Sequence, residues 1–218
     1  MTSTSAYPDP HWETRGCPVC DVAGRALFDF LAHWQFALAT DDEARRRHAM
    51  AGGFCPLHSW QLATWSSAAG LASACETMVE HVADALDEAF GATDGAVPGR
   101  TPALPAPAGR PACAACQVVA YARSHTIRQV ARLIETDDGR AAYARSGGIC
   151  LPDLPPLLAE VLPGNVRSWI LADASRRFRR LGSELRSYLD LWENHDRSKL
   201  TRDHMDATTR ALTHLVGT

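Results

Sequence analysis

Gly52-Gly53-Phe54-Cys55-Pro56-Leu57-His58 is the stretch that decides the fold, read together with Cys17-Pro18-Val19-Cys20. One stretch contains Cys-x-x-His and the other contains Cys-x-x-Cys, and in both a proline follows the first cysteine. Proline is favoured at the first position of an α-helix, because its missing N–H costs no hydrogen bond there. Each stretch therefore predicts a helix that starts with two ligand-type side chains in its first turn.

The second half of the chain repeats this arrangement. Cys113-Ala114-Ala115-Cys116 corresponds to the first cysteine pair, and Gly147-Gly148-Ile149-Cys150-Leu151-Pro152-Asp153 corresponds to the glycine-led stretch. From the second cysteine of the pair to the cysteine of the glycine-led stretch is 35 positions in the first half and 34 in the second. This repetition at matched spacing indicates an internal duplication.

Apolar residues recur at helical spacing between these motifs, as Leu27, Leu31, Trp34 and Leu38 do. No stretch alternates apolar and polar residues in the manner of a strand, so we predict an all-α fold. The prediction is an internally duplicated helical bundle with Cys-x-x-Cys and Cys-x-x-His(Asp) sites at helix N-termini. We expect a long helix over 165–194 to bury Phe178, Leu181, Leu185, Tyr188 and Trp192.

The sequence pattern divides the chain into five predicted parts. Residues 91–112 are rich in proline, glycine and alanine, which is typical of a linker. The predicted parts are a disordered leader at 1–15, a first helical metal-binding repeat at 16–90, the linker at 91–112, a second helical repeat at 113–197 and a C-terminal tail at 198–218.

The spacing also predicts which residues meet. Thiols three positions apart at a helix start can reach one ion, and helix N-termini lower the pKa of a thiol, which favours the thiolate that binds metal. A first helix of ~19 residues carries the chain away from the first cysteine pair. A second helix of ~10 residues and an extended connector then bring it back by nearly the same distance. We therefore expect the two pairs within each half to form one site. The predicted first site is Cys17, Cys20, Cys55 and His58, and the predicted second site is Cys113, Cys116, Cys150 and Asp153.

Zinc is the favoured metal, because tetrahedral zinc commonly takes three cysteines and one histidine. An iron–sulfur cluster is the alternative, and a thiol-redox protein is a second alternative. Asp153 stands where the first half has His58. Three interpretations of Asp153 stay open. It is a metal ligand, it only stabilises the helix dipole, or it lies beside a coordination position that water or a substrate fills. Cys75 falls on an apolar stripe, so we expect it in the core rather than at a metal.

Bulk composition narrows the classes of function. The net charge of −3 favours neither a nucleic-acid partner nor an anionic membrane. The first residues do not have the pattern of a signal peptide, and cysteine pairs of this kind suit a reducing compartment, so we expect a cytoplasmic location. An unknown protein partner and an enzymatic role both stay open. The expected roles are structural, carrier or sensing.

The motif order resembles a family of uncharacterised function, number six thousand and sixty-two in the series of domains of unknown function. The matching residues are Cys17-Pro18-Val19-Cys20, Gly53-Phe54-Cys55-Pro56-Leu57-His58, Cys113 and Cys116, Gly148-Ile149-Cys150, and the segment from Glu184-Leu185 to Asp196-Arg197. The resemblance covers about residues 15–200 and implies a helical, cysteine-bearing architecture without a named activity. Asp153 departs from the histidine of that family, and the linker is longer and richer in proline.

Overall fold

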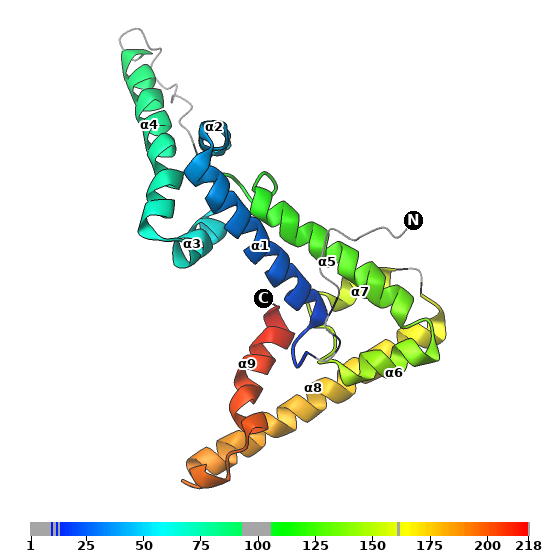
Figure 1. Ribbon diagram of the computed structural model, residues 1–218. Coiled ribbons are helices and arrows are strands. Elements are labelled where there is room, and N and C mark those ends of the chain that lie inside the picture. Colours follow the sequence, from blue (N-terminus) through cyan, green and yellow to red (C-terminus); the bar gives the residue numbers. More distant parts are fainter. Residues whose placement is uncertain (1–9, 11, 13, 93–105, 161, 218) are drawn as a thin grey trace. The chain divides into compact units, whose positions relative to one another are not determined.

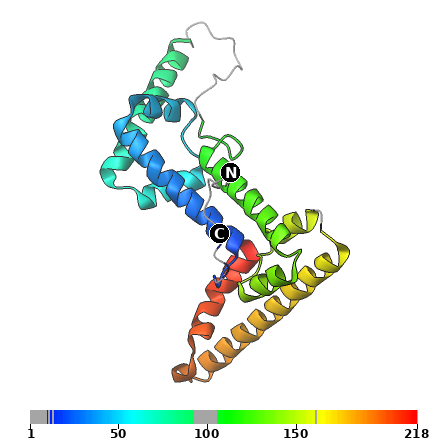
Figure 2. The same ribbon diagram turned by 45° about the vertical axis from the view of Figure 1, so that its right-hand side comes forward.

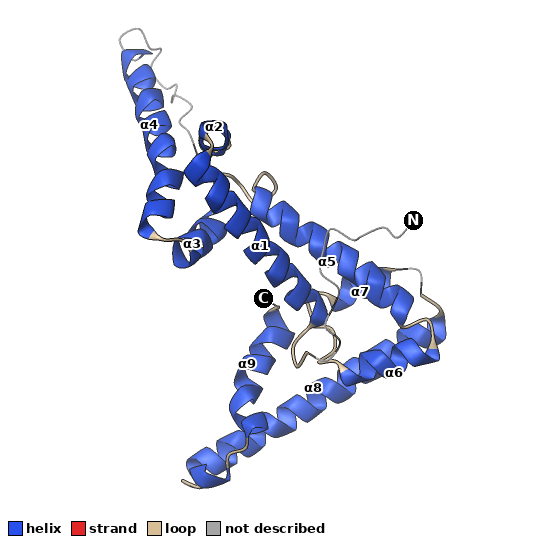
Figure 3. Ribbon diagram, in the orientation of Figure 1, coloured by secondary structure: helices blue, strands red, loops and turns tan. Residues whose placement is uncertain are grey.

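The computed structural model describes residues 10, 12, 14–92, 106–160 and 162–217. Within these residues the regular elements are all helices and no strand is present, which confirms the all-α prediction (Figures 1 and 3). Most of the predicted leader and of the predicted linker lies outside the described residues. The helices are α1 (Pro18–Thr40), α2 (Asp42–Met50), α3 (Pro56–Trp65), α4 (Ala68–Ala92), α5 (Ala114–Leu133), α6 (Asp137–Arg145), α7 (Leu154–Ala159), α8 (Gly164–Glu193), the 3₁₀ helix η2 (Arg197–Lys199) and α9 (Arg202–Val216).

Local sequence explains where these helices begin. Pro18 opens α1 and Pro56 opens α3, as the motifs predict. The side chain of Asp41 caps α2 by accepting a hydrogen bond from the backbone N–H of Glu43, and Thr136 caps α6 through the N–H of Gly139. Such caps satisfy backbone donors that have no partner inside the helix. The equivalent short helices α2 and α6 therefore start by the same device.

The chain divides into two compact units, of which one is built from two separate stretches of sequence and the other from a single stretch. Unit 1 is residues 1–26 with 121–218, and unit 2 is residues 27–120. Helix α1 starts in unit 1 and continues into unit 2, whereas α5 starts in unit 2 and continues into unit 1. The compact units therefore do not follow the division at the linker that the sequence predicts.

Each unit has its own core, and each core contains candidate metal ligands. In unit 1, Cys17, Cys20 and Cys150 are buried with apolar residues of α5, α6, α7 and α8, including Val130, Ile134, Tyr143, Leu157 and Ile170. In unit 2, Cys55 and Cys113 are buried with Leu27, Leu31, Leu38, Phe54 and Leu62. The ligand-type side chains are thus part of the cores themselves.

Helix α9 follows η2, contacts α8 within unit 1, and diverges from α8 with distance from η2 (Figures 1 and 2). Ala207 and Ala211 of α9 lie against Leu181, with Leu185 partly buried beside them. The predicted buried face of α8 is only partly correct: Leu181 is buried, but Trp192 is exposed and lies beneath the guanidinium of Arg197, 3.9 Å from ring centroid to Cζ.

The prediction of an apolar core face on α4 is wrong. Cys75 is exposed, and so are Val82 and Leu86 on the same stripe. Helical spacing identified the stripe, but spacing does not say whether another element covers it. None of the described helices has the length and apolar content required to cross a membrane.

A buried histidine stabilises the core of unit 2. His48 of α2 is 5% exposed, and its Nδ1 accepts a hydrogen bond from the indole N–H of Trp34 at 3.2 Å. Its ring packs edge-on against Phe54, with centroids 4.8 Å apart. Burial lowers the pKa of His48 to about 4, because the charged imidazolium loses its hydration. The histidine is therefore neutral at pH 7 and acts as an acceptor.

We predict that His48 makes the folded protein less stable in mild acid. The unfolded histidine takes up a proton near pH 6.5 and the folded one does so only near pH 4, so stability is lost as pH falls through this window. Between pH 7.5 and 5.5 this residue should cost roughly 1 kcal/mol of unfolding free energy. Urea titrations of the wild type and of His48→Gln at the two pH values check this, since Gln keeps an acceptor without a charge. Equal loss of stability in both proteins would contradict it.

Candidate metal centres

One group of ligand atoms, site A, lies in unit 2 and consists of Cys55, His58, Cys113 and Cys116. Nδ1 of His58 is 3.3 Å from the sulfur of Cys55, 3.5 Å from that of Cys113 and 3.3 Å from that of Cys116. The sulfurs of Cys55 and Cys116 are 3.7 Å apart. Three thiols and one imidazole nitrogen therefore face a common centre.

A second group, site B, lies in unit 1 and consists of Cys17, Cys20, Cys150 and Asp153. Oδ2 of Asp153 is 3.1 Å from the sulfur of Cys150 and 3.7 Å from each sulfur of Cys17 and Cys20. The sulfurs of Cys20 and Cys150 are 3.7 Å apart. All four residues are buried. One carboxylate oxygen here takes the position that the imidazole nitrogen takes in site A.

The eight predicted residues fall into these two groups, but the predicted pairing is wrong. Cys17 and Cys20 do not share a site with Cys55 and His58; they meet Cys150 and Asp153. Likewise Cys113 and Cys116 meet Cys55 and His58. The arrangement is nested: the first and last pairs of the chain form site B, and the two middle pairs form site A.

Helix lengths explain this error. Helix α1 has 23 residues and rises about 35 Å, while the 9 residues of α2 return at most about 14 Å. Helix α2 is therefore too short to bring Cys55 and His58 back beside Cys17 and Cys20, as the predicted pairing requires. Instead α1 begins at site B and carries the chain into unit 2, and α5 begins at site A and carries it back into unit 1.

Local backbone geometry presents each pair of side chains to one point. The first cysteine of each Cys-x-x-Cys pair accepts a helical hydrogen bond, from Asp21 N to Cys17 O and from Gln117 N to Cys113 O. Before the other two pairs, Gly53 and Gly148 have φ of 70° and 85°. Only glycine adopts this region without strain, so the Gly-Gly element turns the chain just before the cysteine.

Arg123 of α5 is the residue that sequence reasoning missed. Its Nε is 3.0 Å from Oδ1 of Asp153 and its Nη2 is 3.1 Å from Oδ2, a two-pronged ion pair with a carboxylate that is 4% exposed. The same Nη2 lies 3.7 Å from the sulfur of Cys20. Arg123 lies seven positions after Cys116, inside an ordinary helical pattern, so nothing in the sequence marks it.

The surroundings of Asp153 argue against a role confined to the helix dipole. Asp153 precedes α7, but its side chain makes no capping hydrogen bond within the described chain. Its carboxylate faces the three sulfurs on one side and the guanidinium on the other. A role confined to the helix dipole does not account for this orientation, whereas a metal ligand held by an outer arginine does.

Electrostatics at both sites favour a bound cation. Mutual contact among the sulfurs and burial raise the pKa of Cys116 to about 12, with burial the larger cause. The contacts with Cys17 and Cys20, together with burial, raise the pKa of Cys150 strongly. Burial lowers the pKa of His58, which keeps its imidazole neutral and able to ligate. Thiols this close cannot ionise together unless a cation lies between them.

Cys55 is the exception among these thiols. Burial raises its pKa, but hydrogen bonds from the backbone N–H of His58 and contacts with the two other thiols of site A outweigh burial, so its pKa is lowered. The N–H groups at the start of α3 are free to act in this way, because they have no partner inside the helix. Cys55 thus ionises more readily than Cys116.

The end of the chain covers site B. The backbone N–H of Leu151 donates to the carbonyl of His214 in α9 at 2.7 Å. A Cβ atom on Gly217 would lie 3.6 Å from the sulfur of Cys20 and 3.1 Å from Nη2 of Arg123. The segment that the sequence marks only as a tail therefore packs directly on the candidate centre.

We predict that ending the chain after Leu200 opens site B alone. Removal of α9 uncovers the sulfur of Cys20 and the guanidinium of Arg123, so metal should leave site B at least ten times faster in EDTA. Release can be followed with a chromogenic zinc indicator. Site A, whose four residues belong to unit 2, is the internal control. Two equal slow phases in the truncated protein would contradict the assignment.

Comparisons with known proteins add no name to these sites. No family model, curated protein or solved structure matches this chain. The functional assignment therefore rests on the geometry and chemistry of the two groups of ligand atoms.

Proposed function

We propose that the protein binds two zinc ions, one in each site, and that both have a structural role. The supporting observation is the spacing of the ligand atoms, which within each site all lie within 4.8 Å of one another. In a tetrahedral complex with zinc–sulfur bonds of about 2.3 Å, the ligand atoms are about 3.7 Å apart. The separations of 3.7 Å between sulfurs in both sites fit this value.

The same compactness favours a single ion over an iron–sulfur cluster. A cluster distributes its cysteines over two or more irons, so its ligand atoms spread further apart than those around one metal. Site A and site B each gather all four atoms around one point. Neither site has four thiols, and zinc accepts sulfur, nitrogen and oxygen ligands together.

The thiol-redox alternative has less support. Reactive redox cysteines are accessible and have lowered pKa values. Cys17 and Cys150 are buried and their pKa values are raised; that of Cys17 is about 12, the outcome of opposing contacts with Cys150 and Cys20 and of burial. A thiol of this kind is a poor nucleophile until a metal removes its proton.

A structural role follows from where the ligands lie in the chain. Site A joins Cys55 to Cys116, 61 positions away, and site B joins Cys17 to Asp153, 136 positions away. Each ion would hold helix ends that are distant in sequence, inside the core of its own unit. Because such sites do not exist in the unfolded chain, the free energy of metal binding adds to folding stability.

Elemental analysis with a visible spectrum tests the proposal. Protein purified without oxygen should be colourless and contain about two zinc per chain. Removal of the metal should unfold the helices, as circular dichroism would record. A brown protein with iron and acid-labile sulfide would overturn the choice of zinc, and a metal-free protein with native helix content would overturn the structural role.

A further inference from the structure

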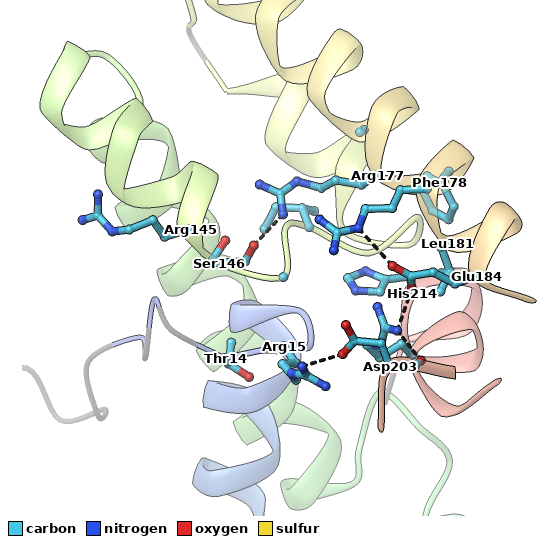
Figure 4. A pocket seen from close by; sticks show the side chains of 15 residues that line it. Thr14, Arg15, Arg145, Ser146, Arg177, Phe178, Leu181, Glu184, Asp203 and His214 are labelled. Carbon is cyan, nitrogen blue, oxygen red and sulfur yellow. Dashed lines mark hydrogen bonds and ion pairs between the residues drawn. The ribbon is translucent and has the colours of Figure 1, made fainter. Parts of the chain in front are cut away.

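Unit 1 contains a cavity of about 320 Å³ that belongs to neither metal site. Its walls come from the segment before α1, the end of α6, and helices α8 and α9 (Figure 4). Cavities of this volume are large enough for a small organic molecule. The cavity contains no candidate metal ligand.

Positive charge dominates the lining of this cavity. Five arginines line it, Arg15, Arg145, Arg177, Arg180 and Arg210, whereas Glu184 and Asp203 are its two acids. Two acids outside the lining also pair with lining arginines, Asp173 with Arg177 and Asp206 with Arg15. Each of these acids also pairs with an arginine outside the lining, Asp173 with Arg176 and Asp206 with Arg202, so they do not reduce the excess of positive charge. Burial keeps the neighbouring His214 neutral by lowering its pKa. The cavity is therefore strongly cationic in a chain whose net charge is −3.

Some of these arginines are fixed in place. Arg177 donates to Asp173 and to the carbonyls of Ser146 and Tyr143, so it forms a rigid wall. Arg210 donates to Glu184 at 2.7 Å and to the carbonyl of Asp203 at 2.8 Å. Its Nε is nevertheless buried and makes no hydrogen bond among the described residues. A buried donor without a partner carries an energetic cost that a bound acceptor would remove.

Two of the lining arginines, Arg145 and Arg180, are exposed and make fewer contacts. Arg145 donates only to a carbonyl of its own helix, that of Ala141, among the bonds that the described chain makes. Arg180 is exposed and shares Glu184 with Arg210. In Figure 4, Arg177 extends from α8 and Arg15 from the segment before α1, whereas Arg145 of α6 points away from both. The lining arginines thus come from several segments of unit 1 and not from one helix.

One wall of the cavity is apolar. Phe178 and Leu181 of α8 lie beside Ile149 and Ala174 in the lining. A bare inorganic ion would gain nothing from this wall. A molecule with an anionic group and a small apolar body would contact both parts.

We propose that this cavity binds a phosphate monoester with a small apolar or aromatic body. Arginine forks match the oxygens of phosphate in geometry and charge. A phosphate monoester carries close to two negative charges at pH 7, which suits the excess of arginine over acid better than a single carboxylate does. The proposal does not depend on which metal the two sites bind.

Isothermal titration calorimetry on the metal-loaded full chain tests this. Phenyl phosphate is the probe. Benzoate tests a single negative charge on the same ring, inorganic phosphate tests the anion without the ring, and phenol tests the ring without the charge. The double variant Arg145→Gln with Arg180→Gln removes two of the three exposed arginines that line the cavity; the third, Arg15, is paired with Asp203 and Asp206. Arg179→Gln is the matched control, because Arg179 is exposed on α8 beside Arg180 and does not line the cavity.

We expect phenyl phosphate to bind at least ten times more tightly than benzoate, phosphate or phenol. The double variant should weaken it at least tenfold, and the control should leave it within twofold. Absence of phenyl phosphate binding to the wild type would overturn the proposal. Equal weakening in the control, which would indicate general charge attraction, or an unchanged affinity in the double variant would overturn it too.

Discussion

Cys150→Ser should expose Cys17 and Cys20 to alkylation while Cys55, Cys113 and Cys116 stay protected. The substitution removes one ligand of site B, so the two thiols at the start of α1 lose their metal. Zinc content should fall from about two ions to about one, with the loss of a binding free energy on the order of 10 kcal/mol at pH 7. N-ethylmaleimide labelling followed by peptide mass spectrometry measures this residue by residue.

The chain offers matched controls for this experiment. Cys75 is exposed and belongs to neither site, so it should be labelled in every protein. Cys113→Ser should give the converse pattern, with Cys55 and Cys116 labelled and the thiols of site B protected. If Cys150→Ser instead exposed Cys113 and Cys116, ligand pairs would meet within each half of the chain, and the nested arrangement would be wrong.

Arg123→Met should lower the zinc affinity of site B by 10- to 100-fold, the usual effect of losing an outer partner of a ligand. Three thiolates and a carboxylate leave site B with one more negative charge than site A, whose fourth ligand is the neutral His58. Arg123 compensates this charge through its two contacts with Asp153. Competition against a chromogenic chelator measures the affinity.

A double variant separates charge balance from simple packing. Asp153→His makes the ligand set of site B equal to that of site A, so Arg123→Met should then cost little affinity. Arg128→Met is the control, since Arg128 is exposed on the same helix. If Arg123→Met weakened zinc binding equally with Asp153 or histidine at position 153, the arginine would act by packing alone.

Much of the fold could be predicted because its signals are local. The prolines after Cys17 and Cys55 predicted the starts of α1 and α3. The nature of the eight ligand-type residues and their spacing in pairs were also visible in the sequence. Two ligand-type residues three positions apart at one helix start can be recognised without knowing how the rest of the chain folds.

What could not be predicted depends on contacts between distant segments. The pairing of sites required the true length of α1 against that of α2. The ion pair of Arg123 with Asp153 joins positions 30 apart, one on α5 and the other just before α7. Cys75 shows the same limit, because an apolar stripe predicts a face but does not show what covers it. The internal duplication stays a prediction, although α2 and α6 both begin at a residue whose side chain caps the helix.

A zinc-edge anomalous difference map from crystals of the full-length protein tests the central claim most directly. We predict two peaks, one about 2.0–2.3 Å from the ligand atoms of Cys55, His58, Cys113 and Cys116, and one at the same distances from those of Cys17, Cys20, Cys150 and Asp153. A peak shared by Cys17, Cys20, Cys55 and His58, or no peak at either group, would contradict the account.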